Sequence, residues 1–202
     1  MTPRPITSVD PKFLSMLGVD EAVRLFRQLL WAEADRIGIG PALISVPGAI
    51  NVADGGVDAE INEVPDKSPG GLIFPGMTRY QIKTGAFSAG NQSEMKDLFL
   101  KDSGKEFKDR VRSCFEKGGV FVAVLFGSDT PERTDDELRK ACQEFVGRLE
   151  PAYKDCDIRI LRQNQIAAFL DRYPSLAFQA QLKNFPGLRN HGEWGGRSLW
   201  VN

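Results

Sequence analysis

Apolar residues recur at steps of three and four positions in the first part of the chain, a spacing that predicts an amphipathic helix. The helix begins near Asp20, which can cap its N-terminus, and ends before Gly38 and Gly40. Residues 1–18 contain prolines and show no periodicity, so we expect them to form an N-terminal arm. The apolar positions of the helix are Val23, Phe26, Leu29, Leu30, Ala34 and Ile37.

Short apolar runs and strict alternation replace the helical spacing after this helix. Apolar residues at 42–46 and 50–52 flank a Pro-Gly pair and predict a strand that runs into a turn. Residues 57–61 alternate apolar and acidic side chains, as a half-buried strand does. A connection rich in proline and glycine follows them.

A second alternating segment occupies residues 79–83 and predicts another strand. Because successive side chains of a strand point to opposite faces, we expect Tyr80 and Ile82 on one face. Gln81 and Lys83 then share the other face.

The second half of the chain alternates strands and helices. Residues 120–126 are continuously apolar and are closed by Gly127, which is typical of a strand covered on both faces. The expected elements after residue 83 are a loop at 85–91, a helix at 104–117, a strand at 120–126, a helix at 134–150 opened by a capping box, a strand at 157–161, and short helices at 165–171 and 175–182. This order predicts an α/β fold with a mixed central sheet flanked by helices.

The composition of the 202 residues, 42% hydrophobic and 26% charged, is that of one ordinary globular domain. No apolar run approaches the roughly 20 residues of a membrane span, and no secretory signal follows Met1. Three cysteines without C-x-x-C spacing indicate reduced thiols, so we expect a cytoplasmic protein. A single histidine, His191, excludes zinc sites and nucleases that need paired histidines.

The net charge of −1 means that any nucleic-acid binding must depend on a local patch. Residues 79–117 carry nine lysines and arginines against six acidic residues, a surplus of three positive charges. This surplus is a modest bias toward phosphate contact, and a mixed solvated helix face explains any one of these residues equally well.

Asp58, Gln81 and Lys83 are the residues whose types and spacing indicate chemistry. Cleavage of a phosphodiester bond uses a divalent metal ion, and hard ions prefer oxygen ligands. An aspartate on one strand can supply an anionic ligand, and the neighbouring strand can add the side-chain oxygen of Gln81 and the backbone carbonyl of Ile82. Lys83 can then orient the attacking water or neutralise charge on the phosphate.

The two segments that carry these residues, Ala-Asp-Gly-Gly-Val-Asp-Ala at 53–59 and Tyr-Gln-Ile-Lys-Thr-Gly at 80–85, resemble the PD-(D/E)xK nuclease superfamily. They are most similar to Mrr-type restriction endonucleases, in which Gly-Gly-(Ile/Val)-Asp precedes a strand with Gln-x-Lys. They also resemble the nuclease domains at the N-terminus of bacterial antiviral STAND NTPases and related defence effectors. The resemblance implies a restriction-endonuclease-like αβββαβ core.

The resemblance also implies roles for individual residues. Asp58 would be the shared metal ligand, Gln81 would occupy a slot that more often holds glutamate or aspartate, and Lys83 would be the catalytic lysine. Such families often place another acid on the first helix, for which Glu33 is the first candidate and Glu21 the second. The cofactor implied is Mg²⁺ or Mn²⁺, and the activity implied is hydrolysis of DNA, double-stranded and with little sequence preference.

Other interpretations of the same residues stay open. Gly55 and Gly56 also suit a plain hairpin turn, with Asp58 and Glu60 on the solvated face of a strand. Glu60, two residues from Asp58, could instead join the site through a water. At the level of function, the alternatives are a catalytically silent nuclease-like module for assembly or nucleic-acid binding, and an RNase on the same scaffold.

The expected domain boundaries are an N-terminal arm at 1–18, a nuclease domain at 19–183 and a C-terminal segment at 184–202. The chain ends in the apolar sequence Leu-Trp-Val-Asn, so we expect the C-terminal segment to lead into a missing NTPase or sensor domain. A homo-oligomer is a further expectation, since the low net charge predicts weak affinity of a single domain for DNA.

Overall fold

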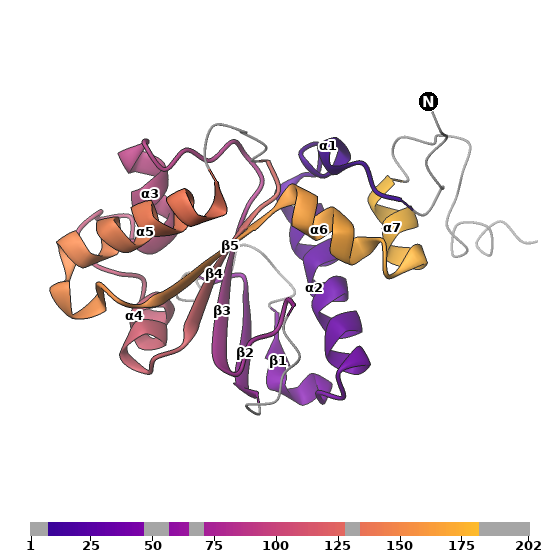
Figure 1. The fold of residues 1–202 in the computed structure, drawn as a ribbon, viewed down its shortest axis with the longest axis horizontal. Coiled ribbons are helices and arrows are strands. Elements are labelled where there is room, and N and C mark those ends of the chain that lie inside the picture. The colour runs from indigo at the N-terminus through magenta and orange to yellow at the C-terminus, as the bar shows by residue number, and fades with distance from the viewer. Residues whose placement is uncertain (1–7, 47–56, 65–70, 128–133, 182–202) are drawn as a thin grey trace, which may run out of the picture.

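The computed structural model describes residues 8–46, 57–64, 71–127 and 134–181. In this part of the chain, five strands form one mixed open sheet in the order β1-β2-β3-β4-β5 (Figure 1). The first three strands pair antiparallel, and β3, β4 and β5 pair parallel. The strands are β1 (Ile44–Ser45), β2 (Ala59–Val64), β3 (Gly76–Lys83), β4 (Val120–Leu125) and β5 (Asp157–Arg162).

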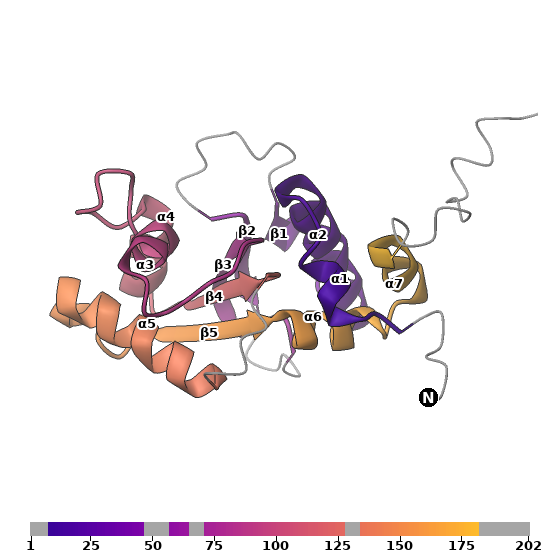
Figure 2. The ribbon, with the colours of Figure 1, turned by 90° about the horizontal axis from the view of Figure 1, so that it is seen from above.

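Helices cover both faces of this sheet, so the predicted α/β class with a mixed, helix-flanked sheet is confirmed (Figures 1 and 2). One layer contains α1 (Pro11–Leu14), α2 (Val19–Arg36), α6 (Gln163–Leu170) and α7 (Pro174–Gln181). The other contains α3 (Gln92–Phe99), α4 (Asp109–Glu116) and α5 (Asp135–Leu149). Two short 3₁₀ turns, Pro41–Leu43 and Pro151–Tyr153, precede β1 and β5.

Each face of the sheet has its own hydrophobic core, because residues along the central strands alternate between the faces. In β4, Val122 and Val124 lie in the core beneath α2 and α6, while Phe121 and Ala123 lie in the core beneath α3, α4 and α5. The six residues of β4 are all buried, as the continuous apolar run predicts.

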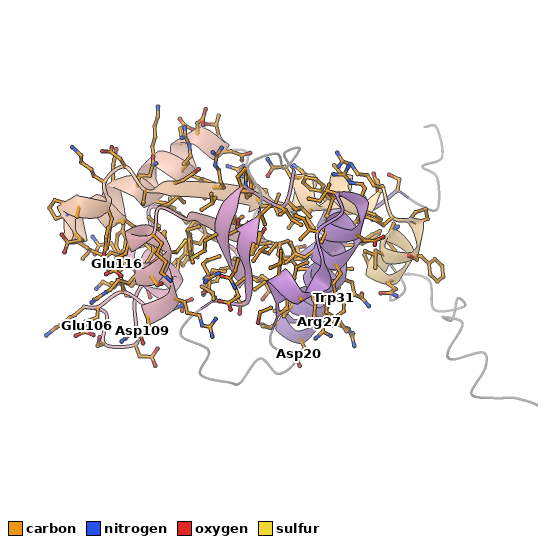
Figure 3. The ribbon with its side chains drawn as sticks, turned by 90° about the horizontal axis from the view of Figure 1, so that it is seen from below. Asp20, Arg27, Trp31, Glu106, Asp109 and Glu116 are labelled. Carbon is orange, nitrogen blue, oxygen red and sulfur yellow. The ribbon has the colours of Figure 1, made fainter. Side chains whose placement is uncertain are left out.

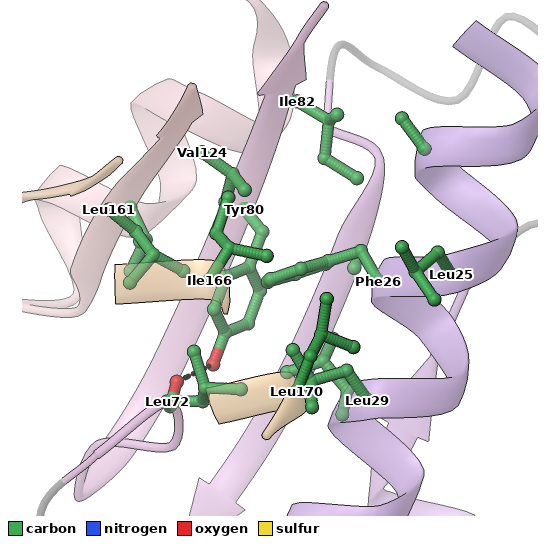
Figure 4. Close-up of a cluster of buried hydrophobic side chains, with 14 of the residues drawn as sticks. Leu25, Phe26, Leu29, Leu72, Tyr80, Ile82, Val124, Leu161, Ile166 and Leu170 are labelled. Carbon is green, nitrogen blue, oxygen red and sulfur yellow. Dashed lines mark hydrogen bonds between the residues drawn. The ribbon is translucent and has the colours of Figure 1, made fainter. Parts of the chain in front are cut away.

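Tyr80 of β3 lies at the centre of the core between the sheet and α2 (Figure 4). Its ring packs against Phe26 of α2, with centroids 5.4 Å apart. Its hydroxyl donates a hydrogen bond to the carbonyl oxygen of Leu72 at 2.5 Å. Complete burial raises the pKa of the Tyr80 hydroxyl, so this group stays a neutral donor. The expected placement of Tyr80 and Ile82 on one face is confirmed.

The described part of the expected N-terminal arm packs against the domain. Leu14 of α1 is fully buried in the core that contains α2, α6 and α7. The backbone N–H of Val9 donates to the Asp171 carboxylate at 2.7 Å, which ties residue 9 to the end of α6. The described part of the expected N-terminal arm is therefore packed on the domain and includes a short helix.

Two local predictions between β3 and β4 also need correction. The helix expected at 104–117 begins only at Asp109, because Phe107 forms an antiparallel bridge with Leu100 instead of continuing the helix. A helix that the apolar pattern did not predict, α3, precedes it and begins after Asn91, whose side chain accepts a hydrogen bond from the N–H of Ser93 at 3.0 Å.

The alternation expected over residues 57–61 holds only from Ala59 onward. Ala59 and Ile61 lie in the core beneath α2, but Val57 lies in the opposite core. The chain bends at Asp58, and β2 begins one residue later. The second apolar run, at 50–52, and the glycine pair at 55–56 lie outside the described residues.

Candidate active site

The antiparallel pairing of β2 and β3 places the start of one strand beside the end of the other. Ala59 is opposite Tyr80, and the backbone N–H of Asp58 donates to the carbonyl oxygen of Tyr80 at 2.8 Å. Asp58 therefore lies next to the last three residues of β3, which include Gln81 and Lys83.

The carboxylate of Asp58 is held by two donors from β3. Its Oδ2 atom accepts hydrogen bonds from Gln81 Nε2 at 2.7 Å and from the backbone N–H of Ile82 at 2.6 Å. A carboxylate only accepts hydrogen bonds, so the nitrogen end of the Gln81 amide must face it. Gln81 Oε1 is then buried, with no hydrogen-bond partner among the described residues.

Lys83, at the end of β3, forms an ion pair with Asp97 of α3. The lysine side chain is 22% exposed and that of Asp97 is 68% exposed. The ammonium group thus lies at the mouth of the site, while Gln81 and Asp58 form its inner part.

A cavity of about 350 Å³ joins these groups. Asp58, Gln81 and Lys83 all line it, together with the loop at 84–87 and the exposed Val19 at the start of α2. The structure therefore brings the three principal candidates from the sequence to one shared space.

The oxygen atoms of this cavity suit a hard divalent cation such as Mg²⁺ or Mn²⁺. Asp58 offers a carboxylate, and the buried Oε1 of Gln81 lacks the partner that a cation would supply. Ile82 faces Asp58 with its N–H group, and its side chain lies in the core beneath α2. Among the described residues, no three His, Cys, Asp or Glu side chains form a group that could hold a metal ion. The side-chain ligands are therefore one carboxylate and one amide oxygen, and the carbonyl of Ile82 stays the predicted backbone ligand.

Glu33 lies far from this cavity, although the resemblance implies a role for an acid on the first helix. Glu33 is fourteen positions after Val19 in α2, which is about 21 Å along a helix. Its carboxylate accepts hydrogen bonds from Arg36 and from the hydroxyl of Tyr173, both at 2.8 Å, and lies 3.6 Å from Arg172. The structure does not bring Glu33 together with Asp58.

The surroundings of Glu33 favour its charged form. Burial would raise the pKa of the Glu33 carboxyl, but hydrogen bonds from Arg36 and Tyr173 and the positive charges of Arg36 and Arg172 outweigh it and lower the pKa. The side chain is a structural anion between α2 and the junction of α6 and α7.

The two other acidic candidates also have local partners. Glu21 accepts a hydrogen bond from the N–H of Gly18 at 3.0 Å and so caps the start of α2. Glu60 forms ion pairs with Arg79 at 3.4 Å and with Arg110. Neither residue lines the cavity that contains Asp58.

Two acids on α3, Glu94 and Asp97, line the cavity and were not predicted from the sequence. The sequence does contain a signal for α3. Asn91 can cap a helix, and Met95, Leu98 and Phe99 follow it at helical spacing and are buried. This pattern is short, because α3 has only eight residues. The small-residue loop before it also favours irregular structure.

Some of the positive charges of residues 79–117 are paired with acidic side chains. Glu106, Asp109 and Glu116 lie together around α4, on the left of the view in Figure 3. The ion pairs made by this segment join Arg79 and Arg110 to Glu60, Lys83 to Asp97, and Lys101 to Glu106 and Asp109. Of these acids, Glu60 is the one that lies outside residues 79–117, so the ion pairs leave most of the surplus in place.

A larger cavity, of about 560 Å³, lies beside β5 and α6. Its charged groups form pairs with each other or with neighbours, such as Arg159 with Asp157 at 2.7 Å and Arg139 with Asp136 at 2.9 Å. It contains no arrangement like that of Asp58, Gln81 and Lys83. Its larger volume would favour it as the functional site, but the side chains Asp58, Gln81 and Lys83 favour the smaller cavity.

No protein-family model, curated protein or solved structure matches this chain. No helix among the described residues is both long and apolar enough to cross a bilayer.

Proposed function

We propose that this chain is a metal-dependent endonuclease domain of the PD-(D/E)xK type with a restriction-endonuclease-like core. The observation that carries the proposal is the cluster of Asp58, Gln81 and Lys83 in one cavity, with Gln81 Oε1 buried and lacking a partner. A carboxylate, an amide oxygen and an ammonium group next to one another suit the hydrolysis of a phosphodiester bond.

Each side chain has a distinct task in this proposal. Asp58 and Gln81 Oε1 would hold the cation, and the hydrogen bonds to Asp58 from Gln81 and from the N–H of Ile82 fix its carboxylate in advance. The bound Mg²⁺ or Mn²⁺ would polarise the phosphoryl oxygen and lower the pKa of the attacking water. Lys83 would orient that water and balance the negative charge that develops on the phosphate.

The proposed substrate is DNA, double-stranded and cut with little sequence preference. Apart from the buried Phe87, the loop after Lys83 carries small and polar residues, including Gly85 and Gly90, which allow a nucleic-acid backbone to approach the cavity closely. The resemblance to the nuclease domains of antiviral STAND NTPases further suggests an effector of anti-phage defence. In that setting a C-terminal NTPase or sensor domain, or oligomerisation, would bring several copies to the DNA.

Plasmid cleavage tests the proposal directly. The purified chain is incubated with supercoiled DNA in Mg²⁺, in Mn²⁺ and in EDTA, at low and high protein concentration and after artificial multimerisation. We expect nicking and linearisation in either metal and none in EDTA, and loss of cleavage in Asp58→Ala and Lys83→Ala. Lys140→Ala, an exposed change on α5 outside the cavity, is the control and should cleave like the wild type. Intact plasmid under all these conditions would rule out the endonuclease.

A catalytically silent nucleic-acid-binding module is the second candidate, because the inner part of the site has a single carboxylate and a neutral amide. This candidate predicts that the chain shifts DNA in a gel without cutting it, and that Asp58→Ala binds like the wild type. Cleavage of a labelled RNA with intact plasmid would instead identify an RNase on the same scaffold.

A further inference from the structure

The ion pair between Lys83 and Asp97 joins the end of β3 to a helix that follows it in the chain. A lysine side chain has four rotatable bonds, so its ammonium group occupies one place only if a partner holds it there. Asp58 accepts hydrogen bonds from Gln81 and from the backbone of Ile82. Asp97 is the carboxylate that contacts the ammonium of Lys83.

Asp97 is well placed to hold this group because α3 is firmly anchored to the sheet. On the inner side of α3, Leu98 and Phe99 are fully buried, and the ring of Phe99 lies 5.2 Å from that of Phe121 in β4. Lys108 Nζ donates to the backbone carbonyl oxygen of Asp97 at 2.7 Å. The backbone of Asp97 is thus fixed relative to the strands that carry Gln81.

Glu94, the other acid of α3 in the cavity, has a different role. It accepts hydrogen bonds from Asn91 Nδ2 at 2.8 Å and from the backbone N–H of Ser88. Glu94 therefore holds the loop that follows Lys83, whereas Asp97 holds the lysine itself.

We propose that Asp97 is the positioning residue for Lys83, and that it keeps the ammonium group at the mouth of the cavity where the scissile phosphate would lie. This inference rests on the proposed nuclease function. Asp97 acts through Lys83 and does not contact the substrate. The role requires a negative charge at this distance, so glutamate should preserve it in part and asparagine should abolish it.

The structure offers a matched control in the pair Lys101–Asp109. Its N–O distance is 2.7 Å, and Asp109 is 73% exposed, close to the 68% of Asp97. Asp109 lies on α4 outside the cavity (Figure 3). Asp109→Asn therefore removes a similarly exposed carboxylate from a lysine without touching the site, although Lys101 is itself 41% exposed and keeps Glu106 at 3.8 Å.

The test combines a measurement that needs no activity with one that does. Metal-free protein is treated with an amine-acylating reagent, and the modification rate of each lysine is measured by peptide mass spectrometry. We expect Asp97→Asn to raise the rate at Lys83 several-fold and to leave Lys101 unchanged, whereas Asp109→Asn should leave the rate at Lys83 unchanged. In plasmid cleavage, Asp97→Asn should lower kcat about tenfold at unchanged KM, Asp97→Glu should recover part of it, and Asp109→Asn should match the wild type.

The two proposals fail in different ways. A wild-type chain that never cuts nucleic acid overturns the nuclease function, whatever the labelling shows. Unchanged labelling of Lys83 in Asp97→Asn overturns the inference about Asp97, even if the wild type is active. Raised labelling of Lys83 with unchanged kcat would also overturn it, because the ion pair would then have no effect on the reaction.

Discussion

Gln81 Nε2 donates a hydrogen bond to Asp58 Oδ2 across 2.7 Å, and this contact determines which end of the amide is left for a ligand. The amide oxygen is buried without a partner among the described residues. A glutamine in this position makes the site stable without a metal ion, because the amide satisfies the aspartate. A glutamate, which is more common in the slot that Gln81 fills by resemblance, would instead place two negative charges side by side.

Gln81→Glu should therefore lower the stability of the metal-free protein and tighten its binding of a divalent cation. Two carboxylates about 4 Å apart repel each other by about 4 kcal/mol at an effective dielectric constant of about 20, which lowers Tm by about 8–16 °C for a chain of this size. We expect this loss in EDTA and its reversal by millimolar Mg²⁺. Thermal unfolding of the wild type and the variant, with and without Mg²⁺, measures both effects.

Gln165 provides the control for this experiment. Its Nε2 atom donates to Asp135 Oδ2 at 3.0 Å, so Gln165→Glu places a second acid beside Asp135, outside the cavity that contains Asp58. Arg162 lies 2.8 Å from Asp135 and lowers the repulsion there, so the loss of Tm should be smaller than in Gln81→Glu. Magnesium should not restore the Tm of this variant. Equal recovery of the two variants in Mg²⁺ would show a general salt effect and would contradict a cation site at Gln81.

Glu33→Gln should affect stability and not catalysis, contrary to the role that the resemblance implies for Glu33. The pKa of this carboxyl is lower in the folded chain than its ordinary value of 4.5. Its charge therefore stabilises the fold above that value, and this contribution is lost as the pH falls through the lower folded pKa. The variant should be about 1–2 kcal/mol less stable at pH 7, since a hydrogen-bonded ionic partner of Arg36 is lost.

Urea unfolding at several pH values measures this effect. The difference between wild type and Glu33→Gln should shrink as the pH is lowered below 4.5 and through the folded pKa of Glu33. A constant difference at all pH values would contradict an ionised Glu33 in the folded state. Plasmid cleavage by the variant should be unchanged at a temperature where both proteins are folded.

Period-2 alternation predicted the β3 part of the site well. Tyr80 and Ile82 pack in the core, so the opposite face must carry Gln81 and Lys83 whatever the details of packing. The position of Asp58 was predicted by motif spacing alone, since the alternation fails one residue before β2. Its contact with Gln81 depends on the strand register, which short sequence patterns do not define.

The residues that the sequence misplaced depend on distance along helices and on contacts between remote segments. Glu33 has a suitable type and lies on the first helix, but the rise of α2 carries it away from the cavity. Phe107 has helical spacing with Val111, yet its pairing with Leu100 delays the start of α4. Asp97 was not predicted as a site residue because its role depends on its contact with Lys83, which lies 14 positions earlier in the chain.

Tyr80→Phe should destabilise the fold while leaving its hydrophobic packing intact. The substitution removes the donor to the carbonyl oxygen of Leu72 in a fully buried place, which costs about 1–3 kcal/mol. Tyr153→Phe is the control, because the Tyr153 hydroxyl bonds Glu116 at 3.3 Å at the surface and its loss should cost less than about 0.5 kcal/mol. Equal unfolding free energies for the two variants in urea would contradict the structural role of the Tyr80 hydroxyl.

Gly127→Ala should disturb the loop that follows Lys83 without changing any side chain of the site. A Cβ atom at residue 127 would overlap the backbone carbonyl oxygens of Thr84 and Gly85, the second at 2.6 Å. Because those atoms belong to the backbone, the chain after Lys83 must move, at a cost of about 1–3 kcal/mol. DNA cleavage should fall by more than the loss of folded protein accounts for, since Thr84 and Gly85 line the cavity.

Gly40→Ala is the control, because a Cβ at residue 40 meets no atom within 4 Å, and it should leave unfolding and cleavage unchanged. If Gly127→Ala also left both unchanged, the close approach of residue 127 to Thr84 and Gly85 would not shape the site.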